Sequence, residues 1–216
     1  MNKEKGRNRM QDLARDIAVD FNGPVGDPRA KVRALEVQLG KSLPHHRFTG
    51  RASAKKLYGV TDRQYDRAME RLFETDFFHE AMTILPGAFE GLGTLYQRGY
   101  NIRFVSGCRG LTTDRIWRFI AEHKLKVAEV ITGEEGKDKT FFYGPCVAAI
   151  DNEVNHLEPL LGHTDTIPIL MLPPHGGVGA GVKQPRNLDR RIRVSTGWDG
   201  ILKLLPALPV ELQRAA

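Results

Sequence analysis

The chain has 216 residues, 41% of them hydrophobic, and a mean hydropathy of −0.36. This length suffices for one α/β core and a smaller satellite domain, and no apolar run approaches the roughly 20 residues of a membrane-spanning helix. Two cysteines, Cys108 and Cys146, are too few for a disulfide framework and lack the spacing of metal ligands. We therefore expect a soluble, cytoplasmic protein with no membrane partner.

The formal net charge is +6, and the basic excess lies at the two ends of the sequence. Residues 1–10 hold four basic side chains against one acidic, and residues 183–216 hold seven against three. We interpret 1–10 as a basic N-terminal tail, because no apolar stretch of signal-peptide length follows it. The basic ends could bind nucleic acid or concentrate a small phosphorylated substrate, but a solvated surface is the simpler interpretation.

The N-terminal part of the sequence predicts one strand and then a group of helices. The apolar run at 17–19 ends in Asp20-Phe21-Asn22-Gly23-Pro24, which is typical of a buried strand that enters a loop. In residues 28–78, apolar side chains recur at helical spacing and no strand signal interrupts them. We therefore predict a small helical cap at 28–78, inserted into an α/β core that comprises 11–27 and 79–216.

The rest of the chain alternates between strand and helix signals. Strands are predicted at 102–105, 127–131, 147–150, 167–172 and 192–194, with helices after residues 86 and 112, a Pro/Gly-rich loop at 173–181 and a last helix at 200–205. This alternation is typical of right-handed βαβ units. It predicts a doubly wound parallel sheet.

Polar residues follow several of the predicted strands. We expect four of these sites to lie together at one edge of the predicted sheet, because each follows the carboxyl end of a parallel strand: Asp20, Ser106, the loop 137–139 and Asp151. Ligands of such sheets bind at that edge. A carboxylate such as Asp20 can attack phosphorus and form an aspartyl-phosphate. Mg²⁺ held by one or two carboxylates would offset their repulsion from the phosphate, and Asp20 and Asp151 suit that task.

The neighbours of these residues suggest how a phosphate could be held. Ser106 could donate to a phosphate oxygen, and the backbone N–H groups of Gly107 and Cys108 could form a small anion nest. Arg109 could contact the phosphate or simply cover the surface. A lysine from the charged loop would offset the charge on carboxylate and phosphate, and both Lys139 and Lys137 are candidates.

Four segments together resemble the motifs of the haloacid dehalogenase superfamily, and the likeness covers nearly the whole chain. In order they are Asp20-Phe21-Asn22-Gly23, Phe104-Val105-Ser106, Lys139 and Ala149-Ile150-Asp151-Asn152. The resemblance implies a Rossmann-like α/β core, a Mg²⁺ cofactor and a phosphohydrolase activity, and it favours Lys139 over Lys137. It assigns Asp20, Asn22, Ser106 and Lys139 as catalytic residues, and Asp20, Asn22, Asp151 and Asn152 as metal ligands.

A closer likeness is to the 5'(3')-deoxyribonucleotidase branch. It is carried by Phe77-Phe78, Leu85-Pro86-Gly87-Ala88, Lys137-Asp138-Lys139-Thr140 and Arg191-Ile192-Arg193 with Trp198. This likeness implies a small phosphorylated substrate of the (deoxy)nucleoside monophosphate type and a helical cap after the first motif. The cap aromatics Phe48, Tyr58 and Phe73 would then stack on the base, although aromatic residues of a small helical domain are more often its core.

Two positions depart from the superfamily pattern. Asn22 stands where most members have the aspartate that protonates the leaving oxygen and then activates water, which is a contribution of about 10²–10⁴-fold in rate. Asn152 replaces the second acid of the fourth motif and removes charge from the metal site. The backbone carbonyl of Asn22 could still bind a cation, because that contact does not depend on the side chain.

These departures leave several interpretations open. The chain could be a weak phosphatase, or one whose leaving group needs no proton. It could bind a nucleotide or a partner without turnover, or Asn22 could have been introduced to trap a complex. Action on nucleic acid ends is a third function, motivated by the basic ends. Asp20 or Ser106 could instead merely shape a turn, and a homo-oligomer remains open.

Overall fold

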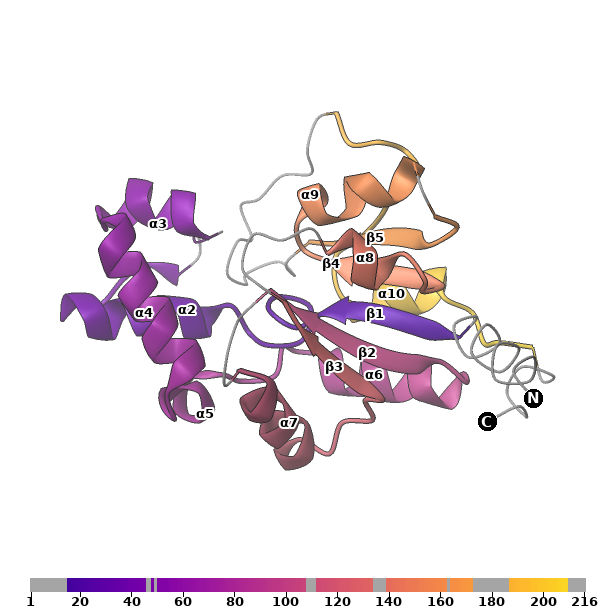
Figure 1. Ribbon diagram of the computed structural model, residues 1–216, viewed down its shortest axis with the longest axis horizontal. Helices are drawn as coiled ribbons and strands as arrows, with labels where there is room; N and C mark the ends of the chain where they lie inside the picture. The colour runs from indigo at the N-terminus through magenta and orange to yellow at the C-terminus, as the bar shows by residue number, and fades with distance from the viewer. Residues whose placement is uncertain are drawn as a thin grey trace, which may run out of the picture.

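The strand that carries Asp20 lies in the interior of a parallel sheet (Figure 1). The computed structural model describes residues 15–45, 48, 50–107, 112–133, 139–162, 164–172 and 187–209. Within them, six parallel strands form one sheet in the order β3-β2-β1-β4-β5-β6. The strands are β1 (Asp16–Asp20), β2 (Asn101–Ser106), β3 (Glu129–Thr132), β4 (Ala148–Asp151), β5 (Ile167–Met171) and β6 (Arg193–Ser195).

The strand order reverses beside β1. The chain first adds β2 and β3 on one side of β1 and then crosses to add β4, β5 and β6 on the other. The register pairs Asp20 with Val105 of β2 and Val19 with Ile150 of β4. The carboxyl ends of β1, β2 and β4 therefore lie side by side at the point where the topology switches, which is where open α/β sheets bind ligands.

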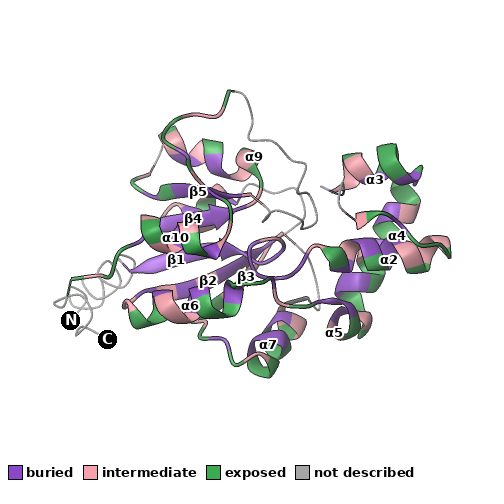
Figure 2. Cartoon of the chain, turned by 180° about the vertical axis from the view of Figure 1, so that it is seen from behind, coloured by how far each residue is buried: buried purple, intermediate pink, exposed green. Residues whose placement is uncertain are grey.

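Helices cover both faces of the sheet. Ile17 and Val19 of β1 belong to one apolar cluster with α6 (Ala88–Gln97), α7 (Thr112–Glu122) and α10 (Trp198–Leu204). Ala18 belongs to a second cluster on the other face, with α8 (Thr140–Tyr143), α9 (Val154–Leu157) and the 3₁₀ helix η2 (Glu158–Gly162). All five residues of β1 are buried, as expected for a strand covered on both sides (Figure 2). The predicted doubly wound α/β fold is confirmed.

A group of helices lies beyond the carboxyl end of β1, at the left of Figure 1. It contains α2 (Arg29–Leu39), α3 (Arg51–Tyr58), α4 (Asp62–Glu74) and α5 (Phe77–Ala81), and we call these helices the cap. Thr61 and Gln64 form a capping box at the start of α4. Gly40 and Gly59 end α2 and α3 in the left-handed conformation that glycine adopts without strain. Helix α5 crosses residue 78, the predicted end of the cap.

The loop from β1 to the cap is fixed by a residue distant in the sequence. The Trp198 indole donates from Nε1 to the Pro24 carbonyl at 2.8 Å, and its ring is buried at the start of α10. Backbone bridges join Asn22 to Gly26 and Gly26 to Ile84. The segment after Asp20 is therefore held against the core at both ends. Among the described helices, none has the length and apolar character needed to cross a membrane.

Candidate active site

Asp20, Ser106 and Asp151 each occupy the last position of a strand, on β1, β2 and β4. All three are buried, and Asp151 is fully inaccessible to solvent. Phe21, just past the end of β1, still donates its N–H to the Val105 carbonyl at 3.0 Å, so the backbone beyond Asp20 remains fixed to β2. The sheet thus brings together the strand-end residues predicted from the sequence.

Lys139 joins two of these strand ends. Its Nζ donates to Asp20 Oδ1 at 2.8 Å and to Asp151 Oδ2 at 3.2 Å. The ammonium group is buried with both carboxylates, immediately before α8. A buried cation between two buried anions offsets much of the cost of desolvating all three charges. Lys137, the rival candidate, lies outside the described residues.

Burial and charge shift the proton affinities of these groups in different directions. Desolvation, with a smaller contribution from the Asp151 charge, raises the pKa of Asp20 to about 6 against the pull of Lys139. Burial alone would lower the pKa of Lys139, but the two carboxylates outweigh it and raise that pKa. Asp151 keeps its pKa below the ordinary value, because Lys139 and the hydrogen bonds around it outweigh desolvation. Asp151 is therefore the permanent anion, and Asp20 is the carboxylate that titrates.

Two further side chains and one backbone N–H hold Asp151, and none of them was identified from the sequence. The Tyr143 hydroxyl donates to Asp151 Oδ2 at 2.6 Å, and His156 Nδ1 lies 2.9 Å from the same oxygen. The Glu153 N–H donates to Oδ1 at 2.8 Å. Tyr143 follows Lys139 by one helical turn, which is the spacing that would have pointed to it had α8 been predicted. These contacts fix the Asp151 carboxylate, and through it the position of Lys139.

Asn22 turns its side chain toward β2. Its Nδ2 donates to Ser106 Oγ at 3.3 Å, and both side chains are buried. A hydroxyl that accepts such a bond can also donate one through its own hydrogen. The Asn22 amide, two residues after Asp20, thus holds the Ser106 hydroxyl in place.

The Asn152 carboxamide lies on the other side of Asp20. One atom of the Asn152 carboxamide lies 3.1 Å from the Asn22 carbonyl oxygen and 3.2 Å from Asp20 Oδ2. With nitrogen at that position, the orientation that satisfies these contacts, the amide donates two hydrogen bonds, and turning the amide over would present a third oxygen to a cation. Neighbouring ligands of an octahedral Mg²⁺ are separated by about 3 Å, given Mg–O distances of about 2.1 Å. The set fits a hard cation, although the described residues contain no cluster of three His, Cys, Asp or Glu side chains.

Gly23 lets the chain pass close to Asn152. Its φ of +134° is rare for residues with a side chain, and a Cβ there would lie 2.6 Å from the Asn152 oxygen. A larger residue would push the carboxamide away from Asp20. The glycine of the first motif is therefore required both by the backbone conformation and by the space that Asn152 occupies.

The residues predicted to bind substrate have different surroundings. Gly107 follows Ser106 at the edge of the site, where a Cβ would lie 3.8 Å from the Lys139 side chain. Cys108 and Arg109 lie outside the described residues. The three aromatic residues predicted to stack on a base, Phe48, Tyr58 and Phe73, are buried in the cap.

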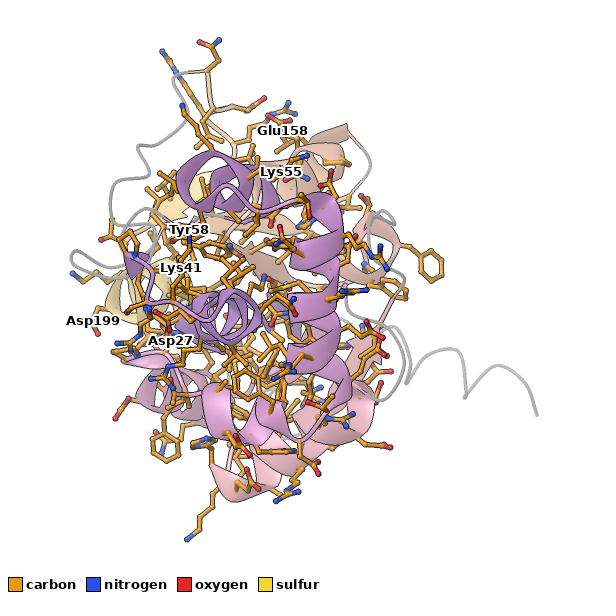
Figure 3. The ribbon with its side chains drawn as sticks, turned by 90° about the vertical axis from the view of Figure 1, so that its left-hand side faces the viewer. Asp27, Lys41, Lys55, Tyr58, Glu158 and Asp199 are labelled. Carbon is orange, nitrogen blue, oxygen red and sulfur yellow. The ribbon has the colours of Figure 1, made fainter. Side chains whose placement is uncertain are left out.

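Contacts within the cap account for these three rings. Phe48 stacks on Tyr58 with ring centroids 6.4 Å apart, and Phe73 packs against Phe78. The Tyr58 hydroxyl donates to the Pro44 carbonyl, and Figure 3, which faces the cap, shows Tyr58 between α3 and α2. At 2%, 7% and 7% exposure, Phe48, Tyr58 and Phe73 offer little surface to a nucleotide base. Base stacking by these residues stays a prediction that their burial does not favour.

Solved structures share this arrangement of strands and helices at low sequence identity. A HAD family hydrolase from Deinococcus radiodurans R1, solved with bound phosphate and sodium, is 16% identical, with a TM-score of 0.60 over 88% of this chain and 93% of that chain. A predicted phosphoglycolate phosphatase from Haemophilus somnus 129PT is 12% identical, with a TM-score of 0.59 over 89% and 98%. A putative phosphatase from Clostridium difficile is 14% identical, with a TM-score of 0.59 over 89% and 99%.

No protein-family model and no curated protein matches the sequence. The structural comparisons nevertheless define the class of fold. The parallel sheet and helical cap form the fold of haloacid dehalogenase-like hydrolases. Because identities of 12–16% show the fold alone, activity has to be argued from the site.

Proposed function

We propose that this protein is a Mg²⁺-dependent phosphohydrolase that acts on a small phosphorylated molecule through an aspartyl-phosphate on Asp20. The observation that carries the proposal is the 2.8 Å contact between Lys139 Nζ and Asp20 Oδ1 at the topological switch point. A carboxylate at that position is reactive, and a fixed cation beside it can also attract a phosphate. Ser106 supplies a hydroxyl donor from the adjacent strand end.

The two oxygens of Asp20 have different neighbours, which assigns them different tasks. Oδ1 faces Lys139, and Oδ2 faces the carboxamide of Asn152 and the Asn22 carbonyl. In the proposed reaction Oδ1 attacks phosphorus, while Lys139 and Ser106 bind the phosphate oxygens that gain negative charge. Fixed charges of this kind stabilise a phosphoryl group in transfer, because they need no reorganisation during the step.

The second oxygen of Asp20 belongs to the proposed cation site. Asp20 Oδ2, the Asn22 carbonyl and Asn152 Oδ1 would hold Mg²⁺, with Asp151 nearby as a further negative charge. When bound, the cation supplies charge neutralisation between carboxylate and phosphate. Asp151 itself is engaged by Lys139, Tyr143 and His156. Its proposed task in the described arrangement is to position Lys139.

A nucleoside monophosphate is the narrower proposal for the substrate. It rests on the sequence likeness to deoxyribonucleotidases, and the burial of Phe48, Tyr58 and Phe73 gives it no support from the cap. The basic sequence, with a net charge of +6, suits any phosphorylated metabolite. We therefore keep nucleotides and sugar phosphates together in the first assay.

Binding without turnover is the second candidate function, and the amides of Asn22 and Asn152 favour it. A site that has lost its acid but kept Lys139, Ser106 and Asp151 can still hold a phosphate. Such a protein would bind inorganic phosphate, and the binding would weaken when Lys139 is replaced. It would release no phosphate from any ester or anhydride. Turnover that disappears with Asp20 would rule this candidate out.

The test is phosphate release from nucleotides, sugar phosphates and acetyl phosphate, with Mg²⁺ and with EDTA. Asp20→Asn keeps the shape of the nucleophile and removes its reactivity. Asp165→Asn makes the same change at an exposed residue before β5, at the opposite edge of the sheet. We expect metal-dependent turnover in the unaltered protein and in Asp165→Asn, and none in Asp20→Asn. Equal turnover in Asp20→Asn would refute the aspartyl-phosphate route.

A further inference from the structure

The identity of residue 22 bears on which phosphoryl compounds the site can cleave. The Asn22 carboxamide is buried beside Asp20 and bonded to Ser106. An amide has no proton that it can give up at ordinary pH. The leaving oxygen of an alkyl phosphate needs such a proton, because an aliphatic hydroxyl titrates near the value of water, about 15.7.

The other described proton donors near Asp20 are directed at carboxylates. Lys139 donates to both Asp20 and Asp151. The Tyr143 hydroxyl donates to Asp151 at 2.6 Å. His156 is bonded to the same Asp151 oxygen. Within the described residues, each of these donors is therefore bound to an anion and unsuited to protonate a leaving group.

What the site offers a leaving group is the fixed positive charge of one buried lysine. Lys139 lies against Asp20, with its Nζ 2.8 Å from Oδ1. Positive charge without a proton stabilises a leaving group that is already an anion.

We propose that this site cleaves phosphoric anhydrides, meaning acyl phosphates and the terminal phosphoanhydrides of polyphosphorylated metabolites, in preference to alkyl phosphate esters. The inference rests on the proposed function and specifies its substrate class. Carboxylic acids titrate near pH 4 and phosphate groups near about 6, so both leave as stable anions at neutral pH. For a nucleotide, the cleaved bond is the terminal anhydride of a diphosphate and not the ester of a monophosphate.

The first step balances without a proton. Asp20 Oδ1 forms a bond to phosphorus, the bond from phosphorus to the anhydride oxygen breaks, and its electron pair leaves with the carboxylate or phosphate anion. Water then attacks phosphorus, Asp20 is released as a carboxylate, and the proton of the water goes to solvent. Because Asn22 cannot act as a base either, this second step is slow and the aspartyl-phosphate accumulates.

The experiment measures how fast the leaving group appears in the first turnover, by rapid quench with Mg²⁺. The substrates are acetyl phosphate, a nucleoside diphosphate and the monophosphate of the same nucleoside. The variants are Asn22→Asp and the control Gln97→Glu, which makes the same amide-to-acid change at an exposed residue that ends α6, at the opposite edge of the sheet. Comparing variant with unaltered protein on each substrate cancels the intrinsic reactivity of that substrate.

We expect the unaltered protein to release acetate in a burst followed by slow turnover, and to release nucleoside from the monophosphate far more slowly. Asn22→Asp should raise the first-turnover rate on the monophosphate by about 10²–10⁴-fold and change that on acetyl phosphate by less than about 10-fold. Gln97→Glu should change neither.

Other outcomes separate the two proposals. Rapid, burst-free cleavage of the monophosphate by the unaltered protein would overturn the anhydride preference and leave the phosphohydrolase intact. An equal effect of Asn22→Asp on all substrates would overturn it as well. Absence of cleavage above Asp20→Asn on every substrate would overturn both proposals together. Rapid monophosphate cleavage by the unaltered protein would overturn the preference even if Asn22→Asp fails to fold.

Discussion

The Nζ atom of Lys139 lies 2.8 Å from Oδ1 of Asp20, although 119 residues separate the two in the sequence. The same ammonium lies 3.2 Å from Asp151, so one buried cation serves two buried carboxylates. With both carboxylates ionised, this group of three carries a net negative charge and would repel a phosphate. The geometry therefore calls for a further cation, and the oxygens near Asn152 are where the structure can hold one.

Replacing Lys139 with Met should abolish most of the activity. The change removes the only positive charge in this group of three, and losing one fixed charge-stabilising donor lowers kcat by about 10²–10³-fold. Lys203→Met, at an exposed position on α10, is the matched control. The measurement is kcat with acetyl phosphate, together with a circular dichroism spectrum to show that each variant is folded. A folded Lys139→Met variant with full activity would show that the contact with Asp20 has no catalytic role.

Asp20 should make activity and stability respond to pH in opposite directions. Its pKa is about 6 in the folded protein, above the ordinary value of 3.8, so the folded state binds the proton more tightly than the unfolded chain does. The stability contributed by that proton is complete below about 3.8 and is lost as pH rises through about 6. Over the same range Asp20 becomes ionised and able to attack phosphorus, so activity rises.

The measurement for this prediction is a pair of pH series. In EDTA, the melting temperature of the unaltered protein should fall between pH 4 and pH 6 by more than that of Asp20→Asn. At low Mg²⁺, kcat/KM should rise over the same range with an apparent pKa near 6. Higher Mg²⁺ should shift the rise to lower pH, because a bound cation favours the ionised carboxylate. Identical melting profiles for the two proteins would show that Asp20 titrates at its ordinary value.

Tyr143→Phe tests how the Asp151 carboxylate is held. The variant removes a 2.6 Å hydrogen bond to a buried anion and leaves the ring in place. Hydrogen bonds to charged groups contribute about 1.5–3 kcal/mol, so the free energy of unfolding in urea should fall by that amount. Tyr96→Phe removes a hydroxyl from an exposed residue of α6 and should change nothing. An unchanged unfolding free energy for Tyr143→Phe would mean that Lys139 and His156 satisfy Asp151 without it.

The sheet and the strand-end residues were predictable because their signals are local. An apolar run that ends in a polar residue fixes both the strand and its end, and the parallel topology then places Asp20, Ser106 and Asp151 at one edge. Tyr143 and His156 could not be found in this way. Each lies on a helix of four residues, which is too short for the 3.6-residue periodicity that marks longer helices.

In the cap, the helices could be predicted from the sequence but the burial of the aromatic side chains could not. Its helical character was evident in the sequence, but the depth of each aromatic ring depends on how short helices pack. Helix α3 has only eight residues, and Tyr58 at its end is needed to cover Phe48. A small domain needs most of its large apolar residues for its own core, so few of them remain available to contact a ligand. Residue type alone could not distinguish these two uses.

Gly23→Ala tests the proposed cation site without touching a ligand. The added Cβ would lie 2.6 Å from the Asn152 oxygen, on a backbone with φ of +134° that alanine rarely adopts. We expect the carboxamide to move away from Asp20 Oδ2 and the Mg²⁺ concentration for half-maximal activity to rise at least about 10-fold, since losing partners around a metal site typically costs about 10–100-fold in affinity.

The matched control is Gly93→Ala on α6, where a Cβ meets nothing within 4 Å. Because alanine favours the helix over glycine by about 0.8–1.0 kcal/mol, this variant should be slightly more stable and equally active. Direct titration with Mn²⁺ by electron paramagnetic resonance gives a readout that does not depend on turnover. Weaker Mn²⁺ binding in Gly23→Ala, but not in Gly93→Ala, would place the cation beside Asn152. Equal binding in both would mean that the cation is held elsewhere.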